Sequence, residues 1–203
     1  MSSNKSVLLI FTKNPELGKC KTRLASTLGD DKALDIYIQL LEHTKNFAEL
    51  IEVDKHVYYS KTIPDKDLWS PDIFDKKHQI EGDLGEKMNK AFEDSFTEGF
   101  DKAVIIGSDC AEINEDDIKE AFKALDKNDV VIGPAIDGGY YLMGMRNYYP
   151  FLFKEKSWST PKLIDETKAD LQKHQVSFEL LKEKSDIDYE EDLKRPGYID
   201  FDL

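Results

Sequence analysis

Short apolar runs alternate with longer helical patterns along the whole chain, and this alternation limits the folds available to it. Runs rich in strand-forming residues occupy residues 6–12, 55–60, 102–109, 129–135, 138–145 and 176–181. Apolar spacing and helix-start signals predict helices over residues 30–50, 84–100, 114–127, 159–174 and 188–195. Strands that alternate with helices form a mostly parallel, mixed sheet with helices on both faces. The sequence therefore predicts one α/β domain over residues 1–203.

The composition argues against several classes of partner. A net charge of −13 over 203 residues opposes binding to nucleic acid and to anionic membranes, whose protein partners present basic surfaces. No apolar run approaches the roughly 20 residues that span a bilayer, so we expect a cytoplasmic protein. Two cysteines, Cys20 and Cys110, are too few for a disulfide framework, and each is expected to be a free thiol. Oligomeric state leaves no signal in the sequence.

The segment KNPELGKCKTRL, at residues 13–24, gathers four cations against a single acid, Glu16. The cations are Lys13, Lys19, Lys21 and Arg23. Gly18 permits a tight backbone path, and Lys and Arg side chains form charge-assisted bonds to phosphate oxygens. The spacing is not that of a Walker A loop. The segment indicates either a site for the phosphates of a nucleotide or a solvated basic loop.

Carboxylates at two places in the chain fit a divalent cation. Asp109 ends the strand predicted over 102–109, and an oxygen ligand at a strand tip suits Mg²⁺ or Mn²⁺ shared with phosphates. Asp186 and Asp188 lie two residues apart, so in an extended stretch they point the same way. The alternatives are a turn residue at 109 and helix-start acids at 186 and 188. The four histidines lack the spacing of a zinc site.

Two glycine-containing segments are candidates for contact with a ligand. In GPAIDGGYYLMGM, Gly138 and Gly139 allow a close approach to the backbone, and Asp137 is placed to bind a sugar hydroxyl or an acceptor. The alternative there is a glycine-rich turn between strands. In EGDLGEKM, Gly82 and Asp83 form a turn in which Asp83 is most simply a helix cap.

Aromatic residues stand close to these segments. Tyr140 and Tyr141 alternate into the strand predicted over 138–145, so one of the two faces the core. Trp158, in the stretch SWST, suits either stacking on a ligand or packing in the core or a lid. Tyr140 and Trp158 are the candidates for contact with the substrate.

Six segments, taken in order, resemble one protein family. They are FTKNPELGKCKTRLA, EGDLGEKM, IIGSDCAEI, GPAIDGGYYLMGM, WST and DIDYEEDL, and they extend over residues 7–193. The family is that of small bacterial glycosyltransferase-A-like proteins, often called selenium- or arsenosugar-associated transferases, many of them labelled only as a domain of unknown function. The chain departs from the family pattern at Ala111, where Pro is usual, and at Tyr189, where Thr is usual.

The resemblance implies a nucleotide-diphospho-sugar transferase fold, with the nucleotide over the loop after the first strand and Mg²⁺ or Mn²⁺ near the Asp after the middle strand. It implies catalytic roles for Asp109, Asp137 and Lys21, and metal ligation by Asp109 and Asp188. The nucleotide-binding residues that it implies are Lys13, Gly18, Lys21, Thr22, Arg23, Gly82, Asp83 and Ser108. The substrate-binding residues that it implies are Asp137, Gly138, Gly139, Tyr140 and Trp158.

Three functions are compatible with these residues. The resemblance over the whole chain favours glycosyl transfer from a nucleotide-sugar to a small-molecule acceptor. The basic loop also resembles that of guanylyltransferases acting on phospholactate or molybdopterin, so nucleotidyl transfer from a nucleoside triphosphate is the alternative. Both chemistries depend on charge stabilisation and positioning rather than on a covalent intermediate. The departures at Ala111 and Tyr189 motivate a third hypothesis, a nucleotide-binding protein without catalysis.

Overall fold

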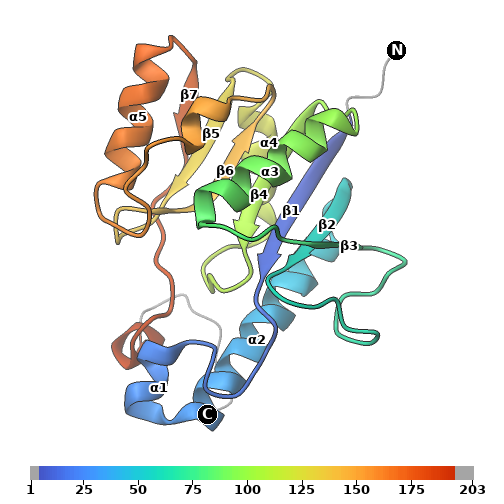
Figure 1. Ribbon diagram of the computed structural model, residues 1–203, viewed down its shortest axis with the longest axis vertical. Coiled ribbons are helices and arrows are strands. Elements are labelled where there is room, and N and C mark those ends of the chain that lie inside the picture. Colours follow the sequence, from blue (N-terminus) through green and yellow to red (C-terminus); the bar gives the residue numbers. More distant parts are fainter. Residues whose placement is uncertain (1–4, 195–203) are drawn as a thin grey trace.

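One seven-stranded mixed sheet forms the centre of the computed structural model, which describes residues 5–194 (Figure 1). The strand order is β3-β2-β1-β4-β6-β5-β7. The strands are β1 Ser6–Thr12, β2 Asp54–Tyr59, β3 Asp75–His78, β4 Lys102–Gly107, β5 Val130–Pro134, β6 Tyr140–Met145 and β7 Phe178–Leu180. Only β6 runs antiparallel to its neighbours within the described sheet. The predicted α/β fold with a mostly parallel sheet is confirmed.

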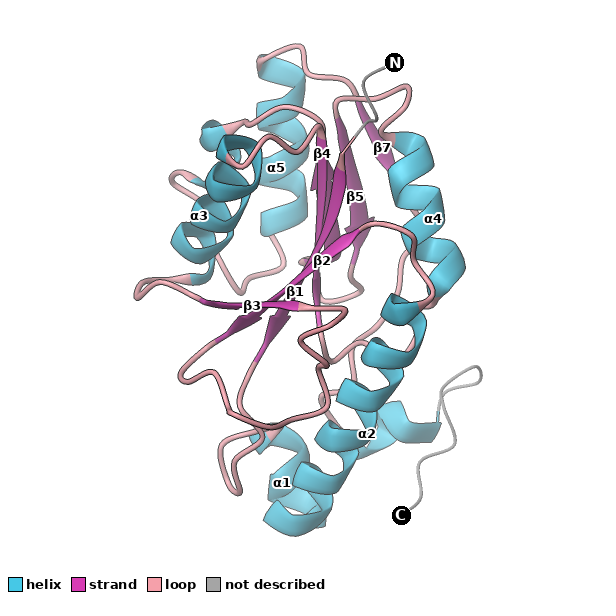
Figure 2. Cartoon of the chain, turned by 90° about the vertical axis from the view of Figure 1, so that its right-hand side faces the viewer, coloured by secondary structure: helices cyan, strands magenta, loops and turns pink. Residues whose placement is uncertain are grey.

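Helices cover both faces of this sheet. They are α1 Thr22–Leu28, α2 Asp30–Glu49, α3 Leu84–Thr97, α4 Glu115–Ala124 and α5 Leu163–Lys173, with 3-10 helices η1 Pro150–Phe153 and η2 Glu190–Lys194. Figure 2 shows α3 and α5 on one face and α2 and α4 on the other. No helix among residues 5–194 has the length and apolar character needed to cross a bilayer.

Strand β1, in the interior of the sheet, lies between two hydrophobic cores. Val7 and Leu9 pack with α3 and α5, whereas Leu8 and Ile10 pack with α2 and α4. Successive side chains of a strand point to opposite faces, so a strand covered on both sides is apolar at every position. All four side chains are fully buried. This is why the run VLLI is continuous rather than alternating.

Five elements differ from the sequence prediction, and two of them, the helix α1 and the 3-10 helix η1, were not predicted at all. The helix predicted from residue 159 begins at Leu163, because Ser159 adopts a left-handed backbone conformation and the Thr160 hydroxyl bonds to the carbonyl of Ser157. The edge strand β3, with the sequence DKKH, was not predicted because it has no apolar residue. The helix predicted over 188–195 is the 3-10 helix η2, and residue 195 lies outside the described residues.

Candidate functional site

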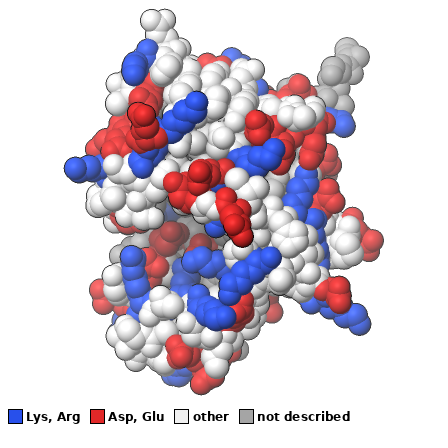
Figure 3. Space-filling model, viewed as in Figure 1, with Lys and Arg blue, Asp and Glu red and all other residues white. Residues whose placement is uncertain are grey.

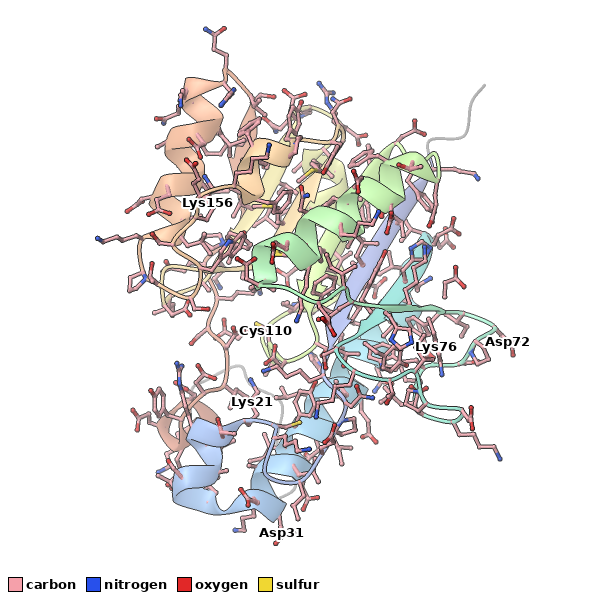
Figure 4. All side chains as sticks on the ribbon, in the orientation of Figure 1. Lys21, Asp31, Asp72, Lys76, Cys110 and Lys156 are labelled. Atoms are coloured by element: carbon pink, nitrogen blue, oxygen red, sulfur yellow. The ribbon has the colours of Figure 1, made fainter. Side chains whose placement is uncertain are left out.

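The site forms where the carboxyl ends of β1 and β4 meet. These strands are parallel neighbours, with Phe11 opposite Gly107, so the loops that follow them leave the sheet at the same edge. Parallel α/β sheets bind ligands at this edge. Figure 4 shows Lys21, from the loop that leads into α1, below the loop after β4 that carries Cys110. The Nζ of Lys21 lies 2.8 Å from Oδ2 of Asp109, which joins the two loops.

Lys21 is held in a conformation that few lysines adopt. It is the N-cap of α1 with φ +47°, in the left-handed region that favours glycine. Its side chain is only 5% exposed. Burial opposes the charge of Lys21, but the carboxylate of Asp109 outweighs burial and raises the lysine pKa. In the same way, burial opposes ionisation of Asp109, and the Lys21 ammonium lowers the pKa of Asp109 below its ordinary value.

Asp186 is a second half-buried carboxylate at this position. Burial raises the pKa of Asp186 to about 7, and the nearby charge of Asp109 adds to the shift. Ile187, fully buried, fixes the segment between Asp186 and Asp188. Asp188 instead pairs with Arg23, at 2.7 Å between Nη1 and Oδ2. The prediction that Asp188 is a metal ligand remains a prediction, and Asp186 is the carboxylate placed beside Asp109.

The four loop cations have different partners. Lys19 pairs with Glu16 at 2.6 Å and is 62% exposed, and Lys61 pairs with the same carboxylate at 2.7 Å. Lys19 therefore faces water. Lys13 forms no ion pair with any residue in the range 5–194 and is exposed at the mouth of the site. Within the described chain, Lys13 is thus the one cation of the cluster that forms no ion pair.

Two cavities meet at this cluster. The larger, about 440 Å³, is lined mainly by aromatic and aliphatic side chains that include Phe11, Met88 and Tyr140. The smaller, about 190 Å³, is lined by Lys13, Lys19, Cys20, Lys21, Thr22, Arg23, Tyr37, Asp109 and Asp188. Both have Lys13, Tyr37 and Asp109 in their walls. On this face, Figure 3 shows Lys and Arg side chains gathered along the lower edge of a hollow.

Tyr37 is a site residue that the sequence analysis missed. It lies in α2 and is 2% exposed, so its ring satisfies the apolar spacing of that helix and resembles an ordinary core residue. Its hydroxyl accepts a hydrogen bond from the backbone N–H of Lys13 at 2.9 Å and donates to the Lys13 carbonyl at 3.0 Å. A tyrosine on the buried face of a helix that follows a basic loop was the only available signal.

The glycines at 138 and 139 are explained by internal packing. A Cβ on Gly138, whose φ is +87°, would lie 2.4 Å from the backbone of Pro161. Asp137 is exposed, and its carboxylate accepts a hydrogen bond from the Gly139 N–H at 2.9 Å, which forms a turn. Neither Gly138, Gly139 nor Asp137 lines either cavity. The ring of Tyr140 does line the large cavity, while its hydroxyl is buried with no hydrogen-bond partner in the described chain.

The remaining predicted residues also have structural roles. Asp83 and Glu86 form a capping box at the start of α3, which confirms the interpretation of Asp83 as a cap. The ring of Trp158 occupies the notch left by Gly85, where a Cβ would lie 2.3 Å from it. Gly82, Asp83 and Trp158 are absent from the walls of both cavities. Ser108 is buried and bonds to Thr12 through its hydroxyl at 3.2 Å.

Both cysteines are free thiols, as expected, and both are buried. Burial raises the pKa of the Cys110 thiol well above its ordinary value, so it does not form the thiolate that a nucleophile requires.

The two departures from the family pattern have local explanations. Ala111 is buried in a small core with Leu24 and Ile36, where it packs beneath α1 and α2. The ring of Tyr189 lies under the guanidinium of Arg23, 5.9 Å from ring centroid to Cζ. Both residues therefore support the loop that carries the cations, rather than interrupting it.

Comparison with solved structures extends these observations. A structure from Desulfovibrio desulfuricans G20, provisionally named a nucleotide-diphospho-sugar transferase, is 31% identical over 92% of this chain and 84% of that chain, with a TM-score of 0.84. The 4-diphosphocytidyl-2C-methyl-D-erythritol synthase of Anaerococcus prevotii DSM 20548 is 12% identical over 93% and 92%, with a TM-score of 0.58. A CMP:2-keto-3-deoxy-manno-octonic acid synthetase complexed with CTP is 10% identical over 94% and 95%, with a TM-score of 0.55. The last two likenesses show the fold alone.

Comparison with sequences gives the family. A search of curated proteins finds no match. Residues 44–160, more than half of the chain, match the family described as uncharacterized proteins conserved in bacteria, DUF2064. With this match and a relative at 31% identity, the chain belongs to the DUF2064 family.

Proposed function

We propose that this protein is a transferase that uses a nucleotide-activated donor, and that it moves a glycosyl group from a nucleotide-diphospho-sugar to a small acceptor. The observation that carries the proposal is the pair of cavities that share Lys13, Tyr37 and Asp109 in their walls. The provisional name of the relative from Desulfovibrio desulfuricans supports this class of donor.

The two cavities suit the two halves of a nucleotide. Aromatic and aliphatic walls around about 440 Å³ suit a nucleoside, because a base has large apolar faces to bury. The smaller cavity, with Lys13, Lys21 and Arg23 in its wall, suits the phosphates. Because the cavities adjoin at Lys13 and Asp109, one ligand can occupy both.

The carboxylates at the junction fit a divalent cation that is shared with phosphates. Asp109 and Asp186 both line the large cavity, and Lys21 is the one cation that forms an ion pair with either of them in the described chain. Within residues 5–194, no three His, Cys, Asp or Glu side chains are grouped to hold a metal by themselves. Mg²⁺ commonly uses one or two carboxylates together with substrate phosphates. Asp109 and Asp186 would hold Mg²⁺ or Mn²⁺, which neutralises charge on a departing diphosphate.

Phosphates that enter the small cavity compete with two carboxylates for the side chains of Lys21 and Arg23. Lys21 is paired with Asp109, and Arg23 with Asp188. A phosphate that takes either cation releases a carboxylate. Lys21 and Arg23 thereby orient the diphosphate and stabilise the charge that develops as its bond to the sugar breaks.

A second candidate, nucleotidyl transfer, is favoured by the number of cations. Lys13, Lys19, Lys21 and Arg23 all line the small cavity, and a triphosphate carries more charge than a diphosphate. In that reaction an acceptor phosphate attacks the α-phosphorus and pyrophosphate leaves. The same side chains would then stabilise the charge of the pyrophosphate.

Calorimetry in the presence of Mg²⁺ tests the donor against nucleotide-sugars and the matching nucleoside triphosphates. We expect one nucleotide-sugar to bind more tightly than its triphosphate, and turnover with an acceptor to release a nucleoside diphosphate. Tighter triphosphate binding with pyrophosphate release supports nucleotidyl transfer, and binding without any turnover supports the non-catalytic alternative. Binding of neither ligand contradicts all three.

Two matched variants locate the binding site. Arg23→Met should weaken nucleotide binding because it removes a cation from the small cavity. Arg146→Met removes a cation that pairs with Asp129 at 2.9 Å away from both cavities, and should leave binding unchanged. Equal weakening by the two variants would place the nucleotide elsewhere.

A further inference from the structure

Tyr37 occupies an unusual position between the core and the site. It projects from α2 into the walls of both cavities, and its ring packs in the core with Leu8 and Leu41. The ring is thus anchored by packing, while its hydroxyl reaches the start of the basic loop.

The hydroxyl of Tyr37 holds both backbone groups of a single residue. It accepts from the Lys13 N–H and donates to the Lys13 carbonyl, at 2.9 and 3.0 Å. Lys13 follows the last residue of β1, so the ladder of the sheet no longer fixes its backbone. There the phenol binds both the N–H and the carbonyl of Lys13, and the Thr12 hydroxyl adds a longer hydrogen bond to the same carbonyl, at 3.3 Å.

A short relay of hydroxyl groups connects this contact to the loop after β4. The Ser108 hydroxyl bonds to the Thr12 hydroxyl at 3.2 Å, and Thr12 approaches the Tyr37 hydroxyl at 3.5 Å. All three side chains are at most 3% exposed. Because Asp109 follows Ser108, the relay fixes the start of the basic loop relative to the carboxylate at the junction of the cavities.

Among the four loop cations, Lys13 is the one whose affinity for a phosphate should depend most on a fixed backbone. Lys19, Lys21 and Arg23 are each paired with a carboxylate, whereas Lys13 has no ion pair in the part of the chain that the structure describes. It lines both cavities, so its ammonium is available to a ligand without breaking an existing ion pair. A positioned, unpaired cation binds a phosphate at a lower cost in conformational entropy.

We infer that Tyr37 is a positioning residue that holds Lys13 ready as the first phosphate ligand of the loop. This inference rests on the proposed function, since it takes the ligand to be a phosphate. The one hydroxyl proton of Tyr37 is donated to the Lys13 carbonyl, so Tyr37 has none to donate to a phosphate. Its effect on binding passes through the backbone of Lys13, and this distinguishes it from a core tyrosine that only supports the fold.

A double-mutant cycle with inorganic pyrophosphate tests the inference. Affinities are measured by calorimetry in metal-free buffer for the wild type, Tyr37→Phe, Lys13→Met and the double variant. We expect Lys13→Met to weaken binding about tenfold, as the loss of one charge-assisted bond does, and Tyr37→Phe about fivefold. The double variant should bind no more weakly than Lys13→Met alone, because Tyr37 acts through Lys13.

Two further measurements distinguish an effect through Lys13 from a general effect of removing a tyrosine hydroxyl. Tyr148→Phe removes a phenol bond to Asn89, 2.9 Å long and outside both cavities, and should leave pyrophosphate affinity unchanged. Hydrogen exchange at the Lys13 amide should accelerate in Tyr37→Phe even without ligand. Additive losses in the cycle, or unchanged exchange, overturn the role of Tyr37. Failure of the wild type to bind pyrophosphate counts instead against the phosphate site, and the inference falls with it.

Discussion

Two regions at the same edge of the sheet have similar sequence signals but different structural roles. The basic loop, residues 13–23, and the turn segment between β5 and β6, residues 135–139, both combine glycine with charged residues. In the basic loop, the charged side chains line two cavities and pair with carboxylates from distant parts of the chain. In the turn segment, Gly138 packs against Pro161 and Asp137 closes its own turn.

The difference shows that a glycine in the sequence predicts a close approach to the backbone but not whether the approaching group is a ligand. A glycine indicates that something approaches the backbone closely, or that the backbone is left-handed. At Gly138 the approaching group is another part of the same chain. In the basic loop the informative residues are the cations, because an acidic protein has no structural need to collect four of them at one place.

The largest expected effect comes from Asp109→Asn in the basic-loop site. The change removes the partner of the buried Lys21 and one carboxylate of the proposed cation site. We expect turnover to fall at least about 100-fold, as when a group that stabilises the transition state is lost. Steady-state kinetics with the identified donor measure it.

The matched variant in the turn segment is Asp137→Asn, whose side-chain oxygen can still accept from the Gly139 N–H. It should lower turnover by less than about tenfold, since it leaves the turn intact. Equal losses in Asp109→Asn and Asp137→Asn would remove the distinction between the two regions. Undiminished turnover in Asp109→Asn would exclude Asp109 from the chemistry.

Gly138→Ala should give the largest loss of stability. The new Cβ would require both a strained backbone at φ +87° and movement of the Pro161 backbone, 2.4 Å away. We expect the free energy of unfolding to fall by about 3 kcal/mol or more, measured by denaturant unfolding.

Gly99 provides the control for Gly138. It has the same φ of +87°, but nothing lies within 4 Å of the place that a Cβ would occupy. Gly99→Ala should therefore cost only the backbone strain, about 1 kcal/mol. A similar loss in both variants would show that strain alone, and not contact with Pro161, requires glycine at 138.

Asp188→Asn tests whether the carboxylate of Asp188 competes with a phosphate for Arg23. We expect this variant to bind pyrophosphate more tightly. It releases Arg23, which then has no competing carboxylate at 2.7 Å. Metal-free affinity for pyrophosphate should rise by up to about fivefold, in line with the modest energy of exposed ion pairs. Calorimetry measures it, and Glu16→Gln, which releases the exposed Lys19, should have a smaller effect. Weaker binding in Asp188→Asn would assign Asp188 to the ligand itself.

The smallest expected effect concerns His56, which lies in β2, outside both regions. This residue contributes to the pH dependence of the free energy of unfolding. Burial, with the help of Lys77, lowers the pKa of His56 below its ordinary value of 6.5. The charged side chains around it are Lys77, Glu98, Asp75 and Asp54. The unfolded chain therefore binds a proton more readily, so this contribution to stability is fully present above pH 6.5 and is lost as pH falls below it.

Replacing His56 reveals this contribution. In His56→Gln, the decline in the free energy of unfolding between pH 6.5 and pH 5 should be smaller by less than about 1 kcal/mol. Denaturant unfolding at the two pH values measures it. An unchanged decline would assign the acid sensitivity to the carboxylates instead.

The sequence by itself determined most of the local elements, but not β3, α1 or η1. The apolar run of β1 predicted a strand buried on both faces, and Asn114 predicted the start of α4, where it forms a capping box. The sequence also predicted that Asp109 follows directly on a strand, as it does after β4. These predictions succeeded because they depend on neighbouring residues and on the shared direction of parallel strands.

Only the tertiary structure decided which groups pair. Lys21 and Asp109 are 88 residues apart, and Arg23 and Asp188 are 165 apart. The sequence singled out these four residues as candidate ligands of phosphate or metal, but it did not predict that they pair with one another. Tyr37 likewise has the pattern of a core residue until α2 is packed against the sheet and its hydroxyl meets Lys13. Such contacts depend on how helices and loops pack in three dimensions, and residue spacing along the chain does not specify that packing.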